Sequence, residues 1–409
     1  MSRFVFFSCI RGWGGSEELW AASAALLAED GHSVTIFKAG FDPNHPRIRQ
    51  LLALGCRIRD LRQVCLPSKV RLPRSLVRFT ESLVRFTGRT AAQKAIRPLV
   101  RAHLTNLNPD LVVVSQGVNF DGLVYSDLCR ISGRPYVVIS QKATDYLWPS
   151  DKDRIVMRSA LQSALRCYFV SQHNLQLTEY QIGERLVNAE IVRNPFLVSG
   201  TQLPWPGTQD DSVKLACVGR LETDEKGQDI LLQVLARSRW RKRNLSVSFF
   251  GAGHHGEALR ELAGYLGLNN VDFPGFVNDV ESIWKTHHAL VLSSRTEGLP
   301  LVLIEAMMCG RFGIVTNTGG NSEVVEDDST GFIASSAKVD EVDNAMERAW
   351  ARREEWESIG KAAGMAVRTM VPPDPAAAFT AKLLRLVESL NPCSHNSEHP
   401  YAYAHKQSQ

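Results

Sequence analysis

Two acidic and two basic side chains stand where they could hold a ligand that is both charged and rich in hydroxyl groups. Glu297 and Glu305 have seven residues between them, and Arg220 and Lys226 lie six positions apart. Carboxylates accept hydrogen bonds from hydroxyl groups. Arg binds phosphate oxygens through two parallel hydrogen bonds, and Lys acts as a point charge. The four side chains therefore predict a site for a diphosphate that carries sugar rings, as in a nucleotide sugar.

The two glutamates are expected at the end of a buried strand and within the helix that follows it. The apolar run 289–292 is typical of a buried parallel strand, and a polar loop follows over 293–299. Pro300 fits the first turn of a helix, where its missing N–H has no partner to lose. The unpaired N–H groups of residues 298–301 would then point at a bound anion.

The two cations are expected in a similar unit. A strand predicted at 213–218 leads into the loop that contains Arg220 and Lys226, and further glycine turns follow at 249–253 and 318–325. A single glycine pair is weak evidence for a ligand site. Four such strand-to-loop features in one order are strong evidence for it.

With these motifs in this order, residues 213–335 resemble the donor-binding half of family-4 glycosyltransferases, which have the GT-B fold. The matching segments are Gly219-Arg220-Leu221, Lys226-Gly227, Gly251-Ala252-Gly253, Gly275-Phe276-Val277, Glu297-Gly298-Leu299-Pro300, Glu305-Ala306, Gly319-Gly320, Glu323-Val324-Val325 and Thr330-Gly331-Phe332. The segment 12–17 resembles the glycine loop after the first strand of that family. The resemblance extends over 1–390 and is weakest over 40–110.

The resemblance implies a retaining transferase that needs neither a metal ion nor another cofactor. It assigns the diphosphate to Arg220, Lys226 and nearby backbone, the donor sugar to Glu297, the ribose to Glu305, and the base to the backbone near Val277. The residues expected to bind the donor are Gly14, Gly15, Gly219, Arg220, Lys226, Gly251, Val277, Glu297, Gly298, Leu299, Pro300 and Glu305. The expected catalytic residues are Arg220, Lys226, Glu297, Asp121 and Gln141.

One position departs from the family pattern. After the strand 136–140, many relatives place a His near the reacting sugar, but this chain has Gln141. Gln can donate and accept hydrogen bonds but cannot act as an acid or base. Asp121, which follows the preceding strand with Asn119, is the candidate base in its place; a helix-capping role is the alternative.

Alternating strands and helices predict two facing parallel-sheet domains of Rossmann type. Strands are predicted at 4–10, 33–37, 111–115, 136–140, 167–171 and 191–194, and then at 213–218, 245–250, 271–273, 289–292, 312–316 and 332–334. The predicted organisation is an acceptor-side domain over 1–195, a linker over 196–212, a donor domain over 213–372, a helix over 373–390 that crosses back to the first domain, and a disordered tail over 391–409.

Composition narrows the class of protein. With 409 residues, of which 44% are hydrophobic, the chain is long enough to form two domains, each with its own hydrophobic core. We find no signal peptide and no stretch of 18 apolar residues. The eight cysteines include no C-x-x-C pair, which is typical of reduced thiols in a cytoplasmic protein.

Positive charge is concentrated in one region. Over 57–101, twelve Lys and Arg side chains stand against two acids, although the whole chain has a net charge of only +4. Arg78, Arg85 and Arg89 alternate with apolar residues, so this region could lie on an anionic membrane surface or attract an anionic acceptor. A solvated basic helix is the alternative. Nucleic-acid binding is not expected, since no known module accompanies the charge.

Other functions fit these motifs less well. A binding-only homologue, acting as a sensor or partner subunit, is suggested by Gln141 alone. A Rossmann oxidoreductase would need the G-x-G-x-x-G spacing that the segment 12–17 lacks, and an epimerase would not explain both glutamates. The expected function is transfer of a sugar, with a UDP-sugar as the expected donor, to an acceptor glycan, lipid-linked sugar or glycoside.

Overall fold

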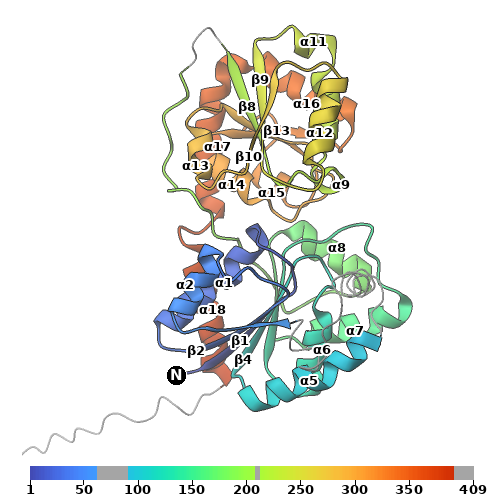
Figure 1. The fold of residues 1–409 in the computed structure, drawn as a ribbon, viewed down its shortest axis with the longest axis vertical. Coiled ribbons are helices and arrows are strands. Elements are labelled where there is room, and N and C mark those ends of the chain that lie inside the picture. Colours follow the sequence, from blue (N-terminus) through green and yellow to red (C-terminus); the bar gives the residue numbers. More distant parts are fainter. Residues whose placement is uncertain (62–90, 208–211, 391–409) are drawn as a thin grey trace, which may run out of the picture.

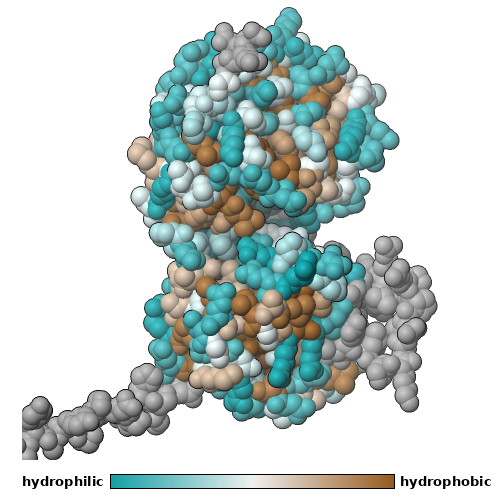
Figure 2. Space-filling model, turned by 60° about the vertical axis from the view of Figure 1, so that its left-hand side comes forward, coloured by the Kyte–Doolittle hydropathy of each residue, from teal (hydrophilic) through white to brown (hydrophobic). Residues whose placement is uncertain are grey.

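The computed structural model describes residues 1–61, 91–207 and 212–390, which form two α/β domains stacked along the long axis (Figure 1). Each domain has one parallel sheet between layers of helices, the two-domain Rossmann-like architecture that the sequence predicts. The molecule narrows where the two domains meet, and hydrophobic and hydrophilic residues are interspersed over both (Figure 2).

The first domain has a seven-stranded sheet in the order β3-β2-β1-β4-β5-β6-β7. Its strands are β1 (Arg3–Ser8), β2 (Ser33–Lys38), β3 (Arg57–Asp60), β4 (Leu111–Gln116), β5 (Tyr136–Ser140), β6 (Arg166–Phe169) and β7 (Ala189–Ile191). Its helices are α1 (Gly15–Glu29), α2 (Pro46–Ala53), α5 (Ala91–Leu107), α6 (Leu123–Ile131), α7 (Asp151–Gln162) and α8 (Gln172–Ile182).

The second domain has a six-stranded sheet in the order β10-β9-β8-β11-β12-β13. Its strands are β8 (Val213–Val218), β9 (Leu245–Phe250), β10 (Val271–Gly275), β11 (Ala289–Leu292), β12 (Phe312–Thr316) and β13 (Gly331–Ala334). Its helices are α9 (Thr223–Lys226), α10 (Gln228–Leu235), α11 (Ser238–Arg241), α12 (Gly256–Tyr265), α13 (Val280–Trp284), α14 (Leu301–Met308), α15 (Asn321–Val324), α16 (Val339–Ala351), η1 (Arg353–Glu355) and α17 (Trp356–Met370).

The central strands are the best predicted elements because they are buried on both faces. Every residue of β4 and β11 is buried, which gives the continuous apolar runs that mark a parallel strand between two helical layers. Because the strands are parallel, their carboxyl ends lie at one edge of each sheet, where the loops that follow them can build a site.

Four local predictions need correction, besides the bounds of β1, β6 and β10, which were predicted at 4–10, 167–171 and 271–273. The strand predicted at 191–194 is β7 (Ala189–Ile191), and the edge strand β3 was not predicted. Pro300 lies outside the first turn of α14, because its ψ of 125° is extended and the helix begins at Leu301. Lys226, predicted in a loop, is the last residue of the one-turn helix α9.

The last described helix, α18 (Pro375–Leu390), packs against α1 of the first domain. Figure 1 shows it beside α1 and α2, at the end of a chain segment that leaves the second domain. Phe379, Leu383 and Val387 of α18 share a buried cluster with Phe4 and Trp20. The core of the first domain is thus completed by residues that follow the second domain in sequence.

The basic region is described only in part. Its two ends lie in β3 and α5, while 62–90, with Arg78, Arg85 and Arg89, falls outside the described residues. Among the helices that the structure describes, none combines the length and the hydrophobicity needed to cross a membrane. The cysteines within the described ranges are all free thiols.

Candidate active site

The structure brings Lys226 and Glu297 together at the carboxyl edge of the second sheet. The Nζ atom of Lys226 lies 2.6 and 2.8 Å from the two carboxylate oxygens of Glu297. The hydroxyl group of Ser294 donates to the same carboxylate at 2.8 Å. Glu297 is buried and lies just before α14. Two residues that are 71 positions apart therefore form one charged unit beside a helix N-terminus.

Arg220 is also paired with acids, but it is more exposed. Its guanidinium group lies 2.7 Å from Glu222 and 2.7 Å from Glu225. Glu225 in turn accepts a hydrogen bond at 2.6 Å from Lys142, which follows β5 in the first domain. Burial raises the pKa of Glu225, but the nearby cations Lys142, Arg220 and Lys226 outweigh burial and keep that pKa below its ordinary value.

Glu305 contacts the segment that joins the two domains. One oxygen of its carboxylate accepts a hydrogen bond at 2.9 Å from the backbone N–H of Leu197. The side chain is buried, and burial raises its pKa to about 7. The hydrogen bond from Leu197 lowers this pKa, and the negative charge of Glu18 on α1 raises it. The predicted role of Glu305 at the ribose stays a prediction.

Two glycines bring the domains into direct contact over the start of α14. A Cβ atom added at Gly298 would lie 1.9 Å from the backbone oxygen of Gln141, and one at Gly15 would lie 2.7 Å from the side chain of Leu301. Leu299 and Pro300 are buried beneath this contact. The first domain therefore touches the second at the start of α14, where the sequence predicts the diphosphate.

Other glycines of the predicted site serve packing within the second domain. A Cβ atom at Gly251, whose φ is +132°, would lie 1.9 Å from the backbone oxygen of Gly219. The two glycines thus allow the ends of β8 and β9 to approach closely. Gly14 precedes α1 with open space around it, and Val277 is half-buried in the loop after β10.

Gln141 contacts Gly298 of the other domain through its backbone oxygen, and its side chain has one hydrogen-bonding group unused. Its side-chain oxygen accepts from Asn194 at 2.7 Å, whereas its Nε2 atom is buried and has no partner among the described residues. An unsatisfied buried donor is unfavourable, so a ligand oxygen at this point would remove that cost. This position therefore suits a hydrogen-bond donor to a ligand.

Asp121 and Asn119 take structural positions. The carboxylate of Asp121 accepts from the backbone N–H groups of Gly117 and Val118 at 3.1 Å. The helix-capping alternative is wrong, because Gly122 is the N-cap of α6 and no side chain caps that helix. Asn119 is buried, accepts from the backbone of Thr144 at 3.1 Å and donates to Gln181. The hydrogen bonds of Asp121 order the loop after β4, and its predicted role as a base stays a prediction.

The donors that could hold a metal ion lie beside this site. Among the described residues, Asp224, His254 and His255 form the one group of three whose ligand atoms lie within 4.8 Å of one another. The Nδ1 atom of His255 already accepts from the backbone N–H of Thr223 at 3.0 Å. The Asp327–Asp328 pair, in contrast, binds Arg348.

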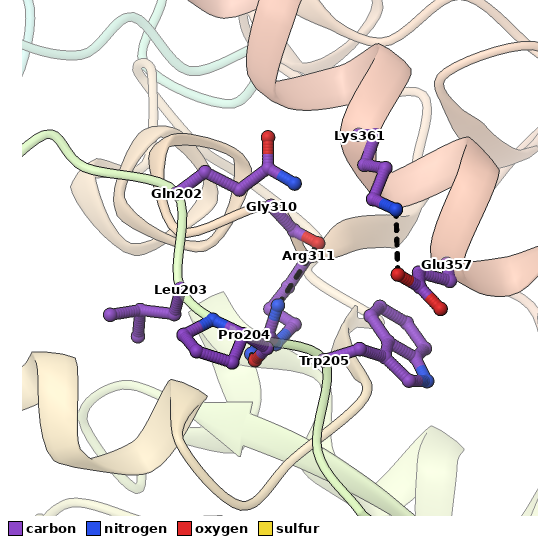
Figure 3. Close-up of a pocket in the computed structure, with 8 residues that line it drawn as sticks. All are labelled: Gln202, Leu203, Pro204, Trp205, Gly310, Arg311, Glu357 and Lys361. Atoms are coloured by element: carbon purple, nitrogen blue, oxygen red, sulfur yellow. Dashed lines mark hydrogen bonds and ion pairs between the residues drawn. The ribbon is translucent and has the colours of Figure 1, made fainter.

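A separate cavity of about 330 Å³ lies on the linker side of the second domain (Figure 3). Its lining residues are Gln202, Leu203, Pro204, Trp205, Gly310, Arg311, Glu357 and Lys361. The buried guanidinium group of Arg311 donates to backbone oxygens, including those of Trp284 and Pro204, and Lys361 lies 2.7 Å from Glu357. These cations are already paired, and none of the predicted donor-binding residues lines this cavity.

Comparison with known proteins identifies the second domain. Residues 203–364 match the family described as glycosyl transferases group 1. The chain carries a group 1 glycosyl transferase domain. A GDP-mannose-dependent alpha-(1-6)-phosphatidylinositol monomannoside mannosyltransferase of Mycobacterium tuberculosis is 32% identical over 183 residues, which cover 42% of this chain and 47% of that protein. The alpha-D-kanosaminyltransferase of Streptomyces kanamyceticus is 29% identical over 142 residues, 34% of this chain and 36% of that protein. The match thus spans about half the length, or less, of these curated relatives.

Solved structures confirm the predicted GT-B fold over nearly the whole chain. HepE of Anabaena, solved in complex with UDP, superposes with a TM-score of 0.71 at 19% identity, covering 95% of this chain and 100% of that one. Sucrose-phosphate synthase of Thermosynechococcus elongatus superposes with a TM-score of 0.71 at 16% identity, covering 96% of this chain and 100% of that one. The group 1 domain is therefore the second of two facing Rossmann-like domains.

Two residues of the site were missed by sequence reasoning. Glu225 stands directly before Lys226 in the group 1 domain, and Lys142 stands directly after Gln141 in the first domain. Their ion pair joins residues 83 positions apart, and their spacing in the sequence does not predict it. The available signal is that each stands next to a residue already predicted to contact the ligand.

Proposed function

We propose that this protein is a glycosyltransferase that moves a sugar from a nucleotide-diphospho-sugar to an acceptor hydroxyl group. The observation that carries the proposal is the Lys226–Glu297 pair, with distances of 2.6 and 2.8 Å, at the start of α14 in a group 1 domain. A cation, a carboxylate and a helix N-terminus at one point suit a ligand with phosphate on one side and sugar hydroxyl groups on the other.

Each part of this site has a distinct role in the proposed reaction. Lys226 and Arg220 neutralise the negative charge that grows on the diphosphate as it leaves, and backbone N–H groups at the start of α14 assist them. Glu297 accepts hydrogen bonds from hydroxyl groups of the donor sugar. Gln141 donates its free N–H to the ligand from the first domain.

We infer that transfer retains the configuration of the sugar and needs no metal ion. The bond between the anomeric carbon and the diphosphate oxygen breaks, and the acceptor oxygen forms the new bond on the same face. The acceptor proton passes to the leaving phosphate oxygen, so the step balances without a protein base. This route fits the hydrogen bonds of Asp121, which order its own loop.

We propose a UDP- or GDP-sugar as the donor. A mannosyltransferase relative is named as GDP-mannose-dependent, and HepE was solved with UDP. The proposed acceptor is a growing polysaccharide, a glycolipid or another cell-surface glycan, and the proposed location is the cytoplasm, with the basic region 57–101 in contact with an anionic membrane surface. Pelleting with anionic vesicles, before and after neutral replacement of Arg78, Arg85 and Arg89, tests the membrane part.

The experiment that tests the function combines binding with turnover. Purified protein is screened for a thermal shift with UDP-, GDP-, ADP- and dTDP-sugars, and release of free nucleotide is measured for each. A ligand that binds only the folded state raises the melting temperature. A shift with one donor together with slow nucleotide release supports the proposal, and no shift with any donor contradicts it.

The Lys226→Ala variant separates catalysis from binding. Because the charge on the phosphate grows in the transition state, this change should lower kcat much more than it raises KM for the donor. An effect on KM alone would contradict the proposed role.

A second candidate is a binding-only homologue that senses a nucleotide sugar. The observation in its favour is Gln141, which cannot titrate and whose side-chain oxygen is already bonded to Asn194 at 2.7 Å. A thermal shift without nucleotide release, even with a panel of acceptors present, would favour this candidate.

A further inference from the structure

We propose that Glu225 is an internal counter-ion, which occupies the anion site between Arg220 and Lys142 until a donor diphosphate displaces it. Lys142 then becomes a third cation of the diphosphate site, contributed by the opposite domain. The inference rests on the proposed function, because it needs a diphosphate ligand between the two domains.

The position of the Glu225 carboxylate carries the argument. One oxygen lies 2.6 Å from the Nζ atom of Lys142, and the other lies 2.7 Å from the guanidinium group of Arg220. The two cations come from different domains, and both point at one carboxylate. A phosphate group is also an oxygen anion of this kind, so the Glu225 side chain marks a place that an anion can fill.

The surroundings of Lys142 tie this place to the donor site. The neighbouring residue, Gln141, is in contact with Gly298 at the start of α14 and has the unsatisfied Nε2 atom described above. Lys226 is close enough to Glu225 to lower its pKa. Lys142 therefore lies next to the predicted donor-binding residues and is only 13% exposed.

The exchange needs movement of a side chain and not of the backbone. The backbone oxygen of Glu225 accepts from the N–H groups of Arg295 and Thr296 at 2.8 and 3.2 Å, which fixes α9 to the loop after β11. Among the described residues, the carboxylate itself is held by ion pairs with Lys142 and Arg220. A diphosphate brings more negative charge than one carboxylate, so it competes well for the same cations.

Arg220 does not lose all its protein partners in this exchange. Glu222 lies 2.7 Å from its guanidinium group and can orient it after Glu225 has moved. Lys142, by contrast, has Glu225 as its ion-pair partner across the junction. Release of the nucleoside diphosphate product would be assisted by return of Glu225 to both cations.

The test measures binding of inorganic pyrophosphate, UDP and GDP by calorimetry. Glu225→Gln keeps the size and the backbone of the residue but removes the competing charge, so it should tighten binding about 3–10-fold, a difference of roughly 1 kcal/mol. Lys142→Met should weaken binding about 10-fold. In the double variant the benefit of Glu225→Gln should shrink, because one of the two contested cations is gone.

Asp229→Asn is the matched control. Asp229 lies in α10 close to the site and pairs with Arg295 at 2.7 Å, so its loss removes one negative charge without freeing Arg220 or Lys142. It should leave binding within twofold of the unmodified protein. Thermal unfolding of each variant checks that the fold is intact.

The possible outcomes distinguish the counter-ion role of Glu225 from the proposed glycosyltransferase function. If the unmodified protein binds a probe and Glu225→Gln binds equally or more weakly, the counter-ion role is wrong and the proposed function stands. If only Glu225→Gln binds, competition by Glu225 is supported. If neither form binds any of the three probes, the proposed function fails and the counter-ion role fails with it.

Discussion

At the scale of single residues, Glu305 should make stability depend on pH. Its pKa is about 7 because it is buried, above the ordinary value for Glu. The folded protein therefore keeps a proton that the unfolded chain loses, so the stabilisation from Glu305 is full at low pH and is lost as pH rises toward 7. In urea denaturation, the free energy of unfolding of the unmodified protein should fall between about pH 5 and pH 7.5. In Glu305→Gln this fall should be smaller by about 2 kcal/mol. Glu261→Gln, at an exposed position of α12, should show no such difference, and equal pH profiles for all three proteins would contradict the assignment.

Residue types predict which side chains could bind a ligand, but not which of them meet in the fold. Glu297 and Lys226 were predicted from their types and from the elements before them, and the structure brings them together. The pairing of Lys142 with Glu225 was not predictable, because it depends on how two domains meet. The unused Nε2 atom of Gln141 depends likewise on which of its neighbours lie within reach, which spacing along the chain does not contain.

At the scale of elements, the loop before α14 should not tolerate a side chain at Gly298. A Cβ atom there would lie 1.9 Å from the backbone oxygen of Gln141. Rotation of a side chain cannot relieve this clash, because the oxygen belongs to the backbone. Gly298→Ala should hold the two domains apart and lower kcat/KM more than 10-fold while the melting temperature changes little. Gly264→Ala in α12, where nothing lies within 4 Å, should keep full activity. Normal turnover in Gly298→Ala would show that this contact is absent from the active arrangement.

Strands were best predicted where an apolar run has clear ends in the sequence. Strands β8, β9, β11 and β12 have the predicted bounds, because apolar runs and glycine turns delimit them. The edge strand β3 was missed because its sequence, Arg-Ile-Arg-Asp, has alternating exposure and three charges. The one-turn helix α9 was missed because Thr-Asp-Glu-Lys has no apolar face, and its residues contact the neighbouring loops instead.

At the scale of the whole molecule, the first domain should depend on the last helix for its stability. Leu383 is fully buried in the cluster that contains Phe4 and Trp20. Leu383→Ala should therefore destabilise the first domain by about 2–5 kcal/mol. Leu390→Ala, at the exposed end of α18, should cost less than about 0.5 kcal/mol. Thermal unfolding followed by an N-terminal-domain probe, such as Trp20 fluorescence, measures both, and equal melting temperatures would contradict the dependence.

The position of α18 also has a consequence for the order of events during synthesis. The first domain leaves the ribosome before the second, yet Phe379, Leu383 and Val387 of α18 leave it after the second. At ordinary rates of translation the nascent first domain would wait on the order of 10 s with the groove beside α1 uncovered. The second domain, whose core cluster comes almost entirely from residues 198–371, can fold during that interval. We expect the nascent chain to be a chaperone client until α18 leaves the exit tunnel.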